Sequence, residues 1–133
     1  MDKALNYLAL ARKAGLAELG EEPAGVAAKA GRAPLVLVAS DASDHTWRRA
    51  KSYVSGTKQQ LLRLPYTKDE MGMAVGRQEL AIAALTDAGL AASLVAALEQ
   101  PAQPVLEALQ ARAREAKQRQ KPRKAPFRPM KKN

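Results

Sequence analysis

Two apolar runs do most to limit the folds open to this chain of 133 residues. Residues 34–40 read PLVLVAS and residues 80–86 read LAIAALT, and no charged side chain interrupts either run. Continuous aliphatic runs of this kind are typical of strands covered on both faces of a sheet. Segments with helical spacing lie before, between and after them. The sequence therefore predicts the α/β class, with helices on both sides of a sheet.

Apolar residues at helical spacing predict helices over residues 2–15, 21–31, 41–56, 67–76 and 87–100. The stretch QLLRLP, residues 60–65, predicts a further short strand, and LAELG, residues 16–20, forms a short link. Residues 101–120 are rich in good helix formers but have a thin apolar face, made of Val105, Ala108 and Leu109. The expected organisation is a domain over residues 1–100, a helical extension over 101–120 and a disordered basic tail over 121–133.

One predicted helix contains a glycine that its own propensity does not explain. Thr67 and Glu70 have the spacing of a capping box, so the helix start is well marked. Gly72 then falls inside the helix, where glycine costs about 1 kcal/mol relative to alanine. A missing Cβ lets another chain segment approach closely. Gly72 therefore predicts a close contact, which either shapes a functional surface or only packs the helix on the sheet.

The basic residues are concentrated at one end of the chain. The net charge is +9, but residues 1–111 hold twelve Lys/Arg and twelve Asp/Glu, whereas residues 112–133 hold ten and one. A basic block at one end is typical of an arm that binds a polyanion, with RNA or DNA first and an anionic membrane surface second. The alternative is a tail that serves solubility or nonspecific docking.

Catalytic chemistry has little support in the sequence. The chain has no cysteine, and His45 is its single histidine, two residues after Ser43, the candidate N-cap of a predicted helix. No glycine-rich phosphate loop and no metal-ligand spacing occur, so neither a cofactor, nor a metal, nor a small-molecule substrate is expected. The sequence contains no signal-peptide pattern or apolar membrane span, which favours a cytoplasmic protein and no membrane partner. A small enzyme remains a third, less favoured interpretation.

Two polar stretches have both a functional and a structural interpretation. TWRRAKSY, residues 46–53, resembles a surface for base stacking and phosphate contacts, but Trp47 shares a helical face with core positions, which favours packing. At the start of the second helix, Glu21 and Glu22 would repel a phosphate but could accept hydrogen bonds from base edges. Ordinary acidic residues at a helix N-terminus are an equally good explanation.

Three stretches together resemble a known family. They are LALARKAGLAELGEE, GRAPLVLVASDASDHT and TKDEMGMAVGRQELAIAALTDAGLA, in that order and with sensible spacing over roughly residues 4–98. They are similar to the kink-turn RNA-binding ribosomal proteins of the L-seven-Ae type, in their small bacterial form. Glu22, Pro23 and Val26 depart from the pattern, because the family tends to have Asn or Lys, then Glu or Gln, and then Lys at these positions. Met71 also departs from it, because Leu is usual there. Lys29 lies one helical turn after the position of the missing lysine.

The resemblance implies a three-layer α/β/α sandwich around a mixed, about four-stranded sheet, and RNA binding without catalysis. It implies two contact regions, the start of the second helix and the loop before the last strand, together with the glycine-containing helix. The RNA-binding residues expected from it are Gly20, Glu21, Glu22, Pro23, Lys29, Lys68, Gly72, Arg77, Gln78, Glu79 and Leu80.

The sequence thus predicts a non-catalytic, ribosome-associated protein that recognises structured, kink-turn-like RNA. The basic residues expected to contact phosphates are Arg112, Arg114, Lys117, Arg119, Lys121, Arg123, Lys124, Arg128, Lys131 and Lys132. The alternative is a protein-interaction module on the same fold, with a degenerate RNA site and a tail that binds an acidic protein.

Overall fold

Four strands and six helices make up residues 2–124, which are the residues that the computed structural model describes. The strands are β1 (Ala17–Leu19), β2 (Leu35–Val38), β3 (Gln60–Arg63) and β4 (Ile82–Leu85). The helices are α1 (Lys3–Lys13), α2 (Glu21–Lys29), α3 (Asp44–Val54), α4 (Lys68–Ala74), α5 (Ala88–Ala96) and α6 (Gln103–Lys124).

The sheet has the strand order β1-β4-β2-β3 and is mixed. Strand β4 pairs antiparallel with both β1 and β2, whereas β2 and β3 are parallel. Every residue of β2 and β4 is buried, so the prediction of two strands covered on both faces is confirmed. The predicted link at residues 16–20 is wrong in part, because Ala17–Leu19 form the edge strand β1 by pairing with Leu85, Ala84 and Ala83.

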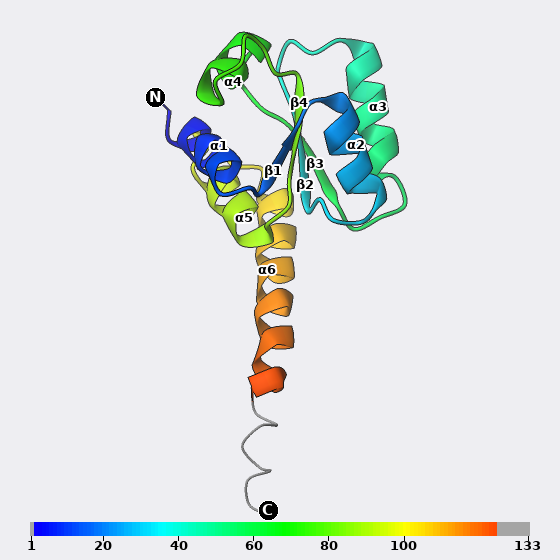
Figure 1. Cartoon of the computed structure of the whole chain (residues 1–133), viewed down its shortest axis with the longest axis vertical. Helices are drawn as coiled ribbons and strands as arrows, with labels where there is room; N and C mark the ends of the chain where they lie inside the picture. The colour runs from blue at the N-terminus through cyan, green and yellow to red at the C-terminus, as the bar shows by residue number, and fades with distance from the viewer. Residues whose placement is uncertain (1, 125–133) are drawn as a thin grey trace, which may run out of the picture.

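Helices cover both faces of the sheet, which confirms the predicted α/β/α sandwich (Figure 1). Helices α2 and α3 pack on one face, where the alanines of α2 lie against Val36, Val38 and Ile82. Helices α1, α4, α5 and α6 pack on the other face, around Leu37 and Leu85. Alanine is small, so the alanines of α2 let the helix backbone lie close to the sheet.

The strands define two ends of the sandwich, which face opposite ways. Val38 lies beside Ile82 and Arg63 at one end, which carries α4 and the start of α2 and is here called the α4 end. Leu35 lies beside Leu85 and Gln60 at the other end, which is here called the α6 end. Helix α2 finishes at the α6 end, and α6 projects past the body there (Figure 1).

The first half of α6 packs on the body. Leu106 and Leu109 are buried in the cluster that α1, α4 and α5 share, while Val105 is half-buried against it. The apolar face predicted for this helix was Val105, Ala108 and Leu109. It did not include Leu106, a buried residue one turn after Gln103. Helix α6 continues to Lys124, and the last part of the predicted tail, residues 125–133, lies outside the described residues.

Among residues 2–124, none of the helices combines the length and the apolar character that crossing a membrane requires.

Candidate nucleic-acid interface

The two regions expected to form a composite surface are neighbours at the α4 end. Gly20 is the N-cap of α2 and has a φ of 102°, a conformation that favours glycine. Its backbone N–H donates to the carbonyl of Ile82 at 2.9 Å, so the start of α2 is fixed beside the start of β4. A Cβ on Gly20 would lie 3.8 Å from a guanidinium nitrogen of Arg77. The start of α2 and the loop before β4 therefore form one continuous surface.

Gly72 shapes this surface from below. A Cβ on Gly72 would lie 2.6 Å from Cα of Glu79, 2.7 Å from its amide nitrogen and 2.9 Å from the carbonyl oxygen of Arg77. All three atoms belong to the backbone, so the loop rests directly on the helix. The Arg77 N–H also donates to the Gly72 carbonyl at 2.8 Å. Gly72 is buried, and its contribution is to shape the loop that Arg77, Gln78 and Glu79 expose.

Helix α4 holds the loop at further points. The predicted capping box is present, because Thr67 and Glu70 each accept a hydrogen bond from the backbone of the other. The carbonyl of Lys68 accepts from the N–H of Leu80 at 3.0 Å, and Leu80 is buried. The Lys68 ammonium lies 3.6 Å from a carboxylate oxygen of Glu79. Leu80 therefore anchors the loop, whereas Lys68 lies on its exposed side.

The first turn of α2 is tied to α3 through contacts that the sequence did not indicate. The carboxylate of Glu21 forms an ion pair with Arg49, and the Tyr53 hydroxyl donates to the Glu21 carbonyl at 3.4 Å. The Tyr53 side chain and then the charge of Glu21 raise the pKa of Arg49. Gly25 makes room for Tyr53, because a Cβ there would lie 2.8 Å from the ring. A glycine inside a helix was the one local signal for this contact.

A shallow hollow of about 430 Å³ lies beside this turn. Glu22, Val26 and Lys29 line its outer side, and the ammonium of Lys29 lies 5.8 Å from the centre of the Tyr53 ring. Pro23 is exposed next to it. Val26 is 57% exposed, which is unusual for an aliphatic side chain. Glu22, Pro23 and Lys29 are therefore accessible to a ligand, while Glu21 is engaged with Arg49.

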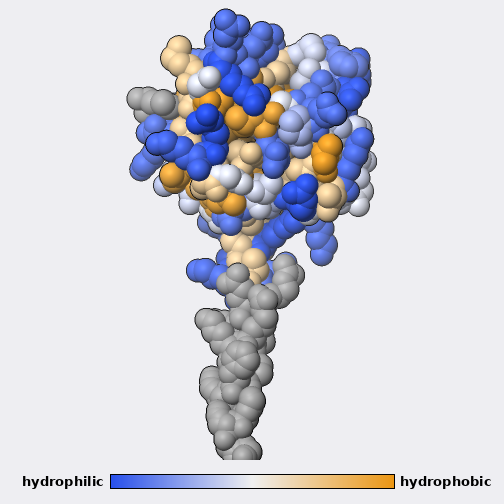
Figure 2. Space-filling view, in the orientation of Figure 1, coloured by the Kyte–Doolittle hydropathy of each residue, from blue (hydrophilic) through white to orange (hydrophobic). Residues whose placement is uncertain are grey.

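Several carboxylates lie around the start of α2 and the adjacent loop, and Glu21 and Glu79 are paired with cations. Glu21 and Glu22 lie in its first turn, Glu79 lies on the adjacent loop, and Asp41 accepts a hydrogen bond from the Lys68 N–H at 2.8 Å. Figure 2 shows hydrophilic residues capping the α4 end. A phosphate placed at the start of α2 would face two carboxylates, whereas amino and imino groups of bases would find acceptors there.

Trp47 packs against the core, and His45 lies at an exposed helix start. Trp47 is half-buried against the core cluster of α2 and α3, so the packing interpretation is the better one. The guanidinium carbon of Arg63 lies 4.5 Å from the centre of its ring, and Arg63 donates to the Ser40 carbonyl at 3.2 Å. His45 is exposed in the first turn of α3, where Ser43 is the N-cap, as predicted.

The predicted phosphate-contacting residues are only partly described. Arg112, Arg114 and Lys117 have described side chains, and Arg112 donates to the Gly31 carbonyl at 3.2 Å. Four more belong to the last part of α6, and the remaining three lie outside the described residues. They are Arg119, Lys121, Arg123 and Lys124 in α6, and Arg128, Lys131 and Lys132 beyond it.

Comparison with known proteins places the fold. No protein-family model matches the chain, and no curated protein matches it. A solved protein with unknown function from Bacillus halodurans C is similar over 75% of this chain and 100% of its own, with 27% sequence identity and a TM-score of 0.69. A Giardia lamblia 15.5kD RNA binding protein is similar over 80% of this chain and 84% of its own, with 15% identity and a TM-score of 0.61. The chain therefore shares its fold with an RNA-binding protein.

Proposed function

We propose that this protein is a non-catalytic RNA-binding protein that recognises a bent, kink-turn-like RNA through its α4 end. The observation that carries the proposal is the packing of the Arg77–Glu79 backbone on Gly72, which sets this loop beside the start of α2. The fold shared with the Giardia RNA-binding protein supports it. We further propose that the protein acts in the cytoplasm, in association with the ribosome.

Each part of the composite surface has a distinct task in this proposal. Glu22 and the free N–H groups at the start of α2 face base edges, which are accessible where RNA is bent or unpaired. Arg77 and Gln78 are exposed on the adjacent loop and contact the backbone or a splayed base. Lys68 lies beside Glu79, so it can exchange that partner for a phosphate. None of these tasks involves a chemical step.

The test compares binding of the full chain to a kink-turn RNA and to a straight duplex of equal length and composition. The wild type should prefer the bent RNA, and Arg77→Gln should reduce that preference. Arg12→Gln makes the same change at an exposed position in the last turn of α1 and should leave the preference intact. Equal binding of both RNAs by the wild type would contradict the proposal.

A protein-interaction module is the second candidate function. Val26 on α2 is 57% exposed and Met73 on α4 is 78% exposed, and apolar side chains at the surface suit a protein partner better than a phosphate backbone. In that case neither RNA would be preferred, and Val26→Lys would abolish binding of the partner. If the RNA proposal holds, Val26→Lys should instead strengthen binding of the bent RNA, because it adds a cation at the surface.

A further inference from the structure

Helix α6 leaves the body at the end opposite to the composite surface. Its buried residues, Leu106 and Leu109, dock its first half, and the helix then passes the α6 end and continues to Lys124 (Figure 1). The residues from Lys117 to Lys124 add about 12 Å of helix at 1.5 Å per residue. The four-residue strands separate the two ends by about 13 Å, to which the loops add further length. Basic residues of α6 therefore do not lie beside Arg77.

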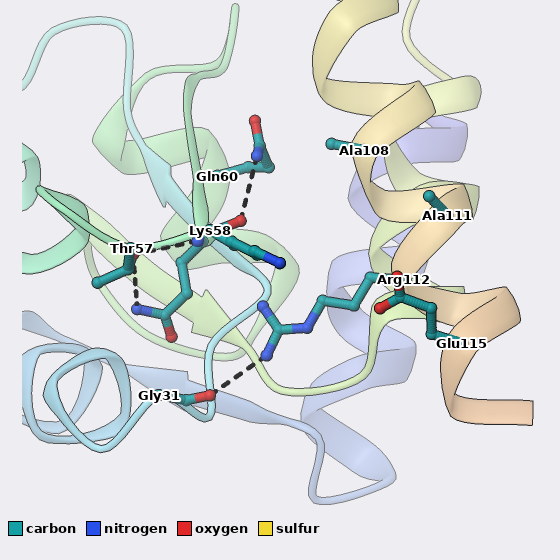
Figure 3. Close-up of a pocket in the computed structure, with 9 residues that line it drawn as sticks. Gly31, Thr57, Lys58, Gln60, Ala108, Ala111, Arg112 and Glu115 are labelled. Atoms are coloured by element: carbon teal, nitrogen blue, oxygen red, sulfur yellow. Dashed lines mark hydrogen bonds between the residues drawn. The ribbon is translucent and has the colours of Figure 1, made fainter. Parts of the chain in front are cut away.

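Cations from three segments, one of them α6 itself, gather where α6 leaves the body. Lys58 and Arg112 point into one hollow of about 590 Å³ between α6 and the start of β3 (Figure 3). Arg32 lines a neighbouring hollow together with Arg112. Arg114 and Lys117 follow on the exposed side of α6, one turn apart. We call these five residues the basal cluster.

A hydrogen bond holds one member of the basal cluster in place. Arg112 donates to the carbonyl of Gly31, two residues past the end of α2, so its positive charge lies near the negative end of that helix. This contact uses one of the five N–H donors of a guanidinium group. The others remain able to bind a phosphate, which arginine contacts with two parallel hydrogen bonds. Arg112 is therefore preorganised to donate hydrogen bonds to a phosphate, and it also links α6 to the end of α2.

The remaining cations of the cluster are not committed to acidic partners. Among residues with described side chains, ion pairs join Arg49 to Glu21 and Lys68 to Glu79, and neither pair involves the basal cluster. Glu115 lines the same hollow as Lys58, and Asp87 lies nearby as the N-cap of α5, where it accepts from the Leu90 N–H. Figure 2 shows hydrophilic residues on both sides of the α6 stem. Three cations of the basal cluster, Arg32, Lys58 and Arg112, therefore line the two hollows against one carboxylate, Glu115.

We infer that the basal cluster is a second RNA-binding surface, which contacts the phosphates of a helical segment outside the bent element read by the α4 end. The inference rests on the RNA binding proposed above and adds a separate surface to it. Positive charge without base-reading groups gives affinity and position but little sequence information. One RNA would therefore span the protein, with its bend at the α4 end and its stem at the α6 end.

The experiment uses the full chain and two RNAs, one a minimal kink-turn and the other the same kink-turn with a long helical stem. The variant Arg32→Gln/Lys58→Gln removes two cations whose side chains take part in no hydrogen bond or ion pair among the described residues. We expect about tenfold weaker binding of the long-stem RNA at physiological salt, and a slope of log K against log salt that is shallower by about 2. Binding of the minimal RNA should change by less than about twofold.

The matched control is Arg48→Gln/Lys51→Gln, which removes one arginine and one lysine from exposed positions of α3, across the sheet from α6. Equal losses in the two double variants would mean a general charge effect and would overturn the inference, as would no loss in either. A wild type that binds the two RNAs no better than straight duplex defeats the proposed function instead. The basal cluster is then judged by whether its variant loses duplex affinity and the control does not. Loss of polyglutamate binding without loss of RNA binding would assign the cluster to an acidic protein.

Discussion

The backbone of Glu79 lies so close to Gly72 that a single methyl group would not fit between them, since a Cβ on Gly72 would be 2.6 Å from Cα of Glu79. This contact joins a helix to the loop that forms half of the composite surface. It also explains why a helix with a complete capping box has a glycine in its interior. The glycine is needed for the neighbouring chain segment rather than for the helix itself.

Gly72→Ala should lower the stability of the protein even though alanine is the better helix former. Alanine gains about 1 kcal/mol of helix propensity. The overlap with backbone atoms of Arg77 and Glu79 costs typically 1–3 kcal/mol, and the backbone cannot rotate away as a side chain would. Urea unfolding should therefore show a net loss, and binding of the bent RNA should weaken because the loop moves.

Gly89→Ala provides the control for this prediction. Gly89 is exposed in the first turns of α5, and a Cβ there would meet only a carboxylate oxygen of Asp87, at 3.4 Å. The substitution should leave stability unchanged or raise it slightly through helix propensity. A Gly72→Ala protein that is more stable than the wild type and binds RNA equally well would contradict the role assigned to Gly72.

Gly25 and Tyr53 form a second pair of this kind, and their coupling can be measured. A Cβ on Gly25 would lie 2.8 Å from the Tyr53 ring, so Gly25→Ala should displace the ring and break its hydrogen bond to the Glu21 carbonyl. We expect a loss of about 1–3 kcal/mol in the free energy of unfolding. The same substitution in a Tyr53→Ala background should cost much less. A double-mutant cycle with additive effects would show that the two residues act independently.

The buried strands and the helix starts were predictable because their signals are local. Continuous apolar runs revealed β2 and β4, and Ser43 and Thr67 marked two helix starts by capping residues alone. Strand β1 was not predictable in this way. Only Leu19 of its three residues is buried, and the strand is extended because β4 supplies its hydrogen-bond partners from more than sixty residues away.

The composite surface was predictable from residue types only up to a point. Gly72 indicated a close contact, but nothing in its neighbourhood showed that the partner was the backbone at Glu79. The ion pair of Glu21 with Arg49 depends on how α2 packs against α3, which no spacing within either helix reveals. The adjacency of the start of α2 and the loop before β4 followed from the family resemblance, not from periodicity.

Asp2 and Tyr66 should make stability depend on pH at both extremes. The Tyr66 hydroxyl donates to the Asp2 carboxylate at 2.6 Å. This bond and that from the Ala4 N–H lower the pKa of Asp2 from 3.8, so their contribution is present above that pH and is lost as the pH falls further. Burial and the same bond raise the pKa of Tyr66 from 10.0, so its contribution is present below pH 10.0 and is lost as the pH rises further.

Tyr66→Phe tests this coupling directly. The variant should be less stable than the wild type between about pH 4 and pH 10, where the wild type keeps both a charged Asp2 and a neutral Tyr66. The difference should shrink in acid and in strong base. Unfolding by urea at a series of pH values measures it. A difference that stays constant across the whole range would mean that the hydroxyl acts without titration of either group.

Arg63 covers the single tryptophan of the chain, which gives a specific spectroscopic test. Arg63→Ala should expose the Trp47 ring to water and shift its fluorescence emission to longer wavelength. The loss of the cation–π contact should cost about 0.5–1 kcal/mol. Arg63→Lys keeps the charge but loses the planar stacking, so its emission maximum should lie between those of the wild type and Arg63→Ala. An unchanged emission maximum in Arg63→Ala would show that Arg63 does not shield the ring.

Gln59 is a buried polar residue that joins three segments at the α6 end. It is 6% exposed, its amide nitrogen donates to the Ala28 carbonyl at 2.9 Å, and its amide oxygen accepts from the Ala33 N–H at 2.8 Å. Gln59→Ala would leave the buried Ala33 N–H without a partner, at a cost of about 1–3 kcal/mol for the unsatisfied group, whereas the Ala28 carbonyl would keep its hydrogen bond from the Gly31 N–H. Gln59→Glu keeps the acceptor but places a carboxylate against the Ala28 carbonyl, so this variant should be destabilised at neutral pH and recover in mild acid, where the protonated side chain can donate again. Thermal unfolding of both variants at pH 5 and pH 8 distinguishes these effects.

Gln59 also affects the basal cluster, because it follows Lys58 in the chain. Loss of the Gln59 hydrogen bonds should loosen that cluster. Gln59→Ala should then weaken binding of the long-stem RNA but not of the minimal kink-turn.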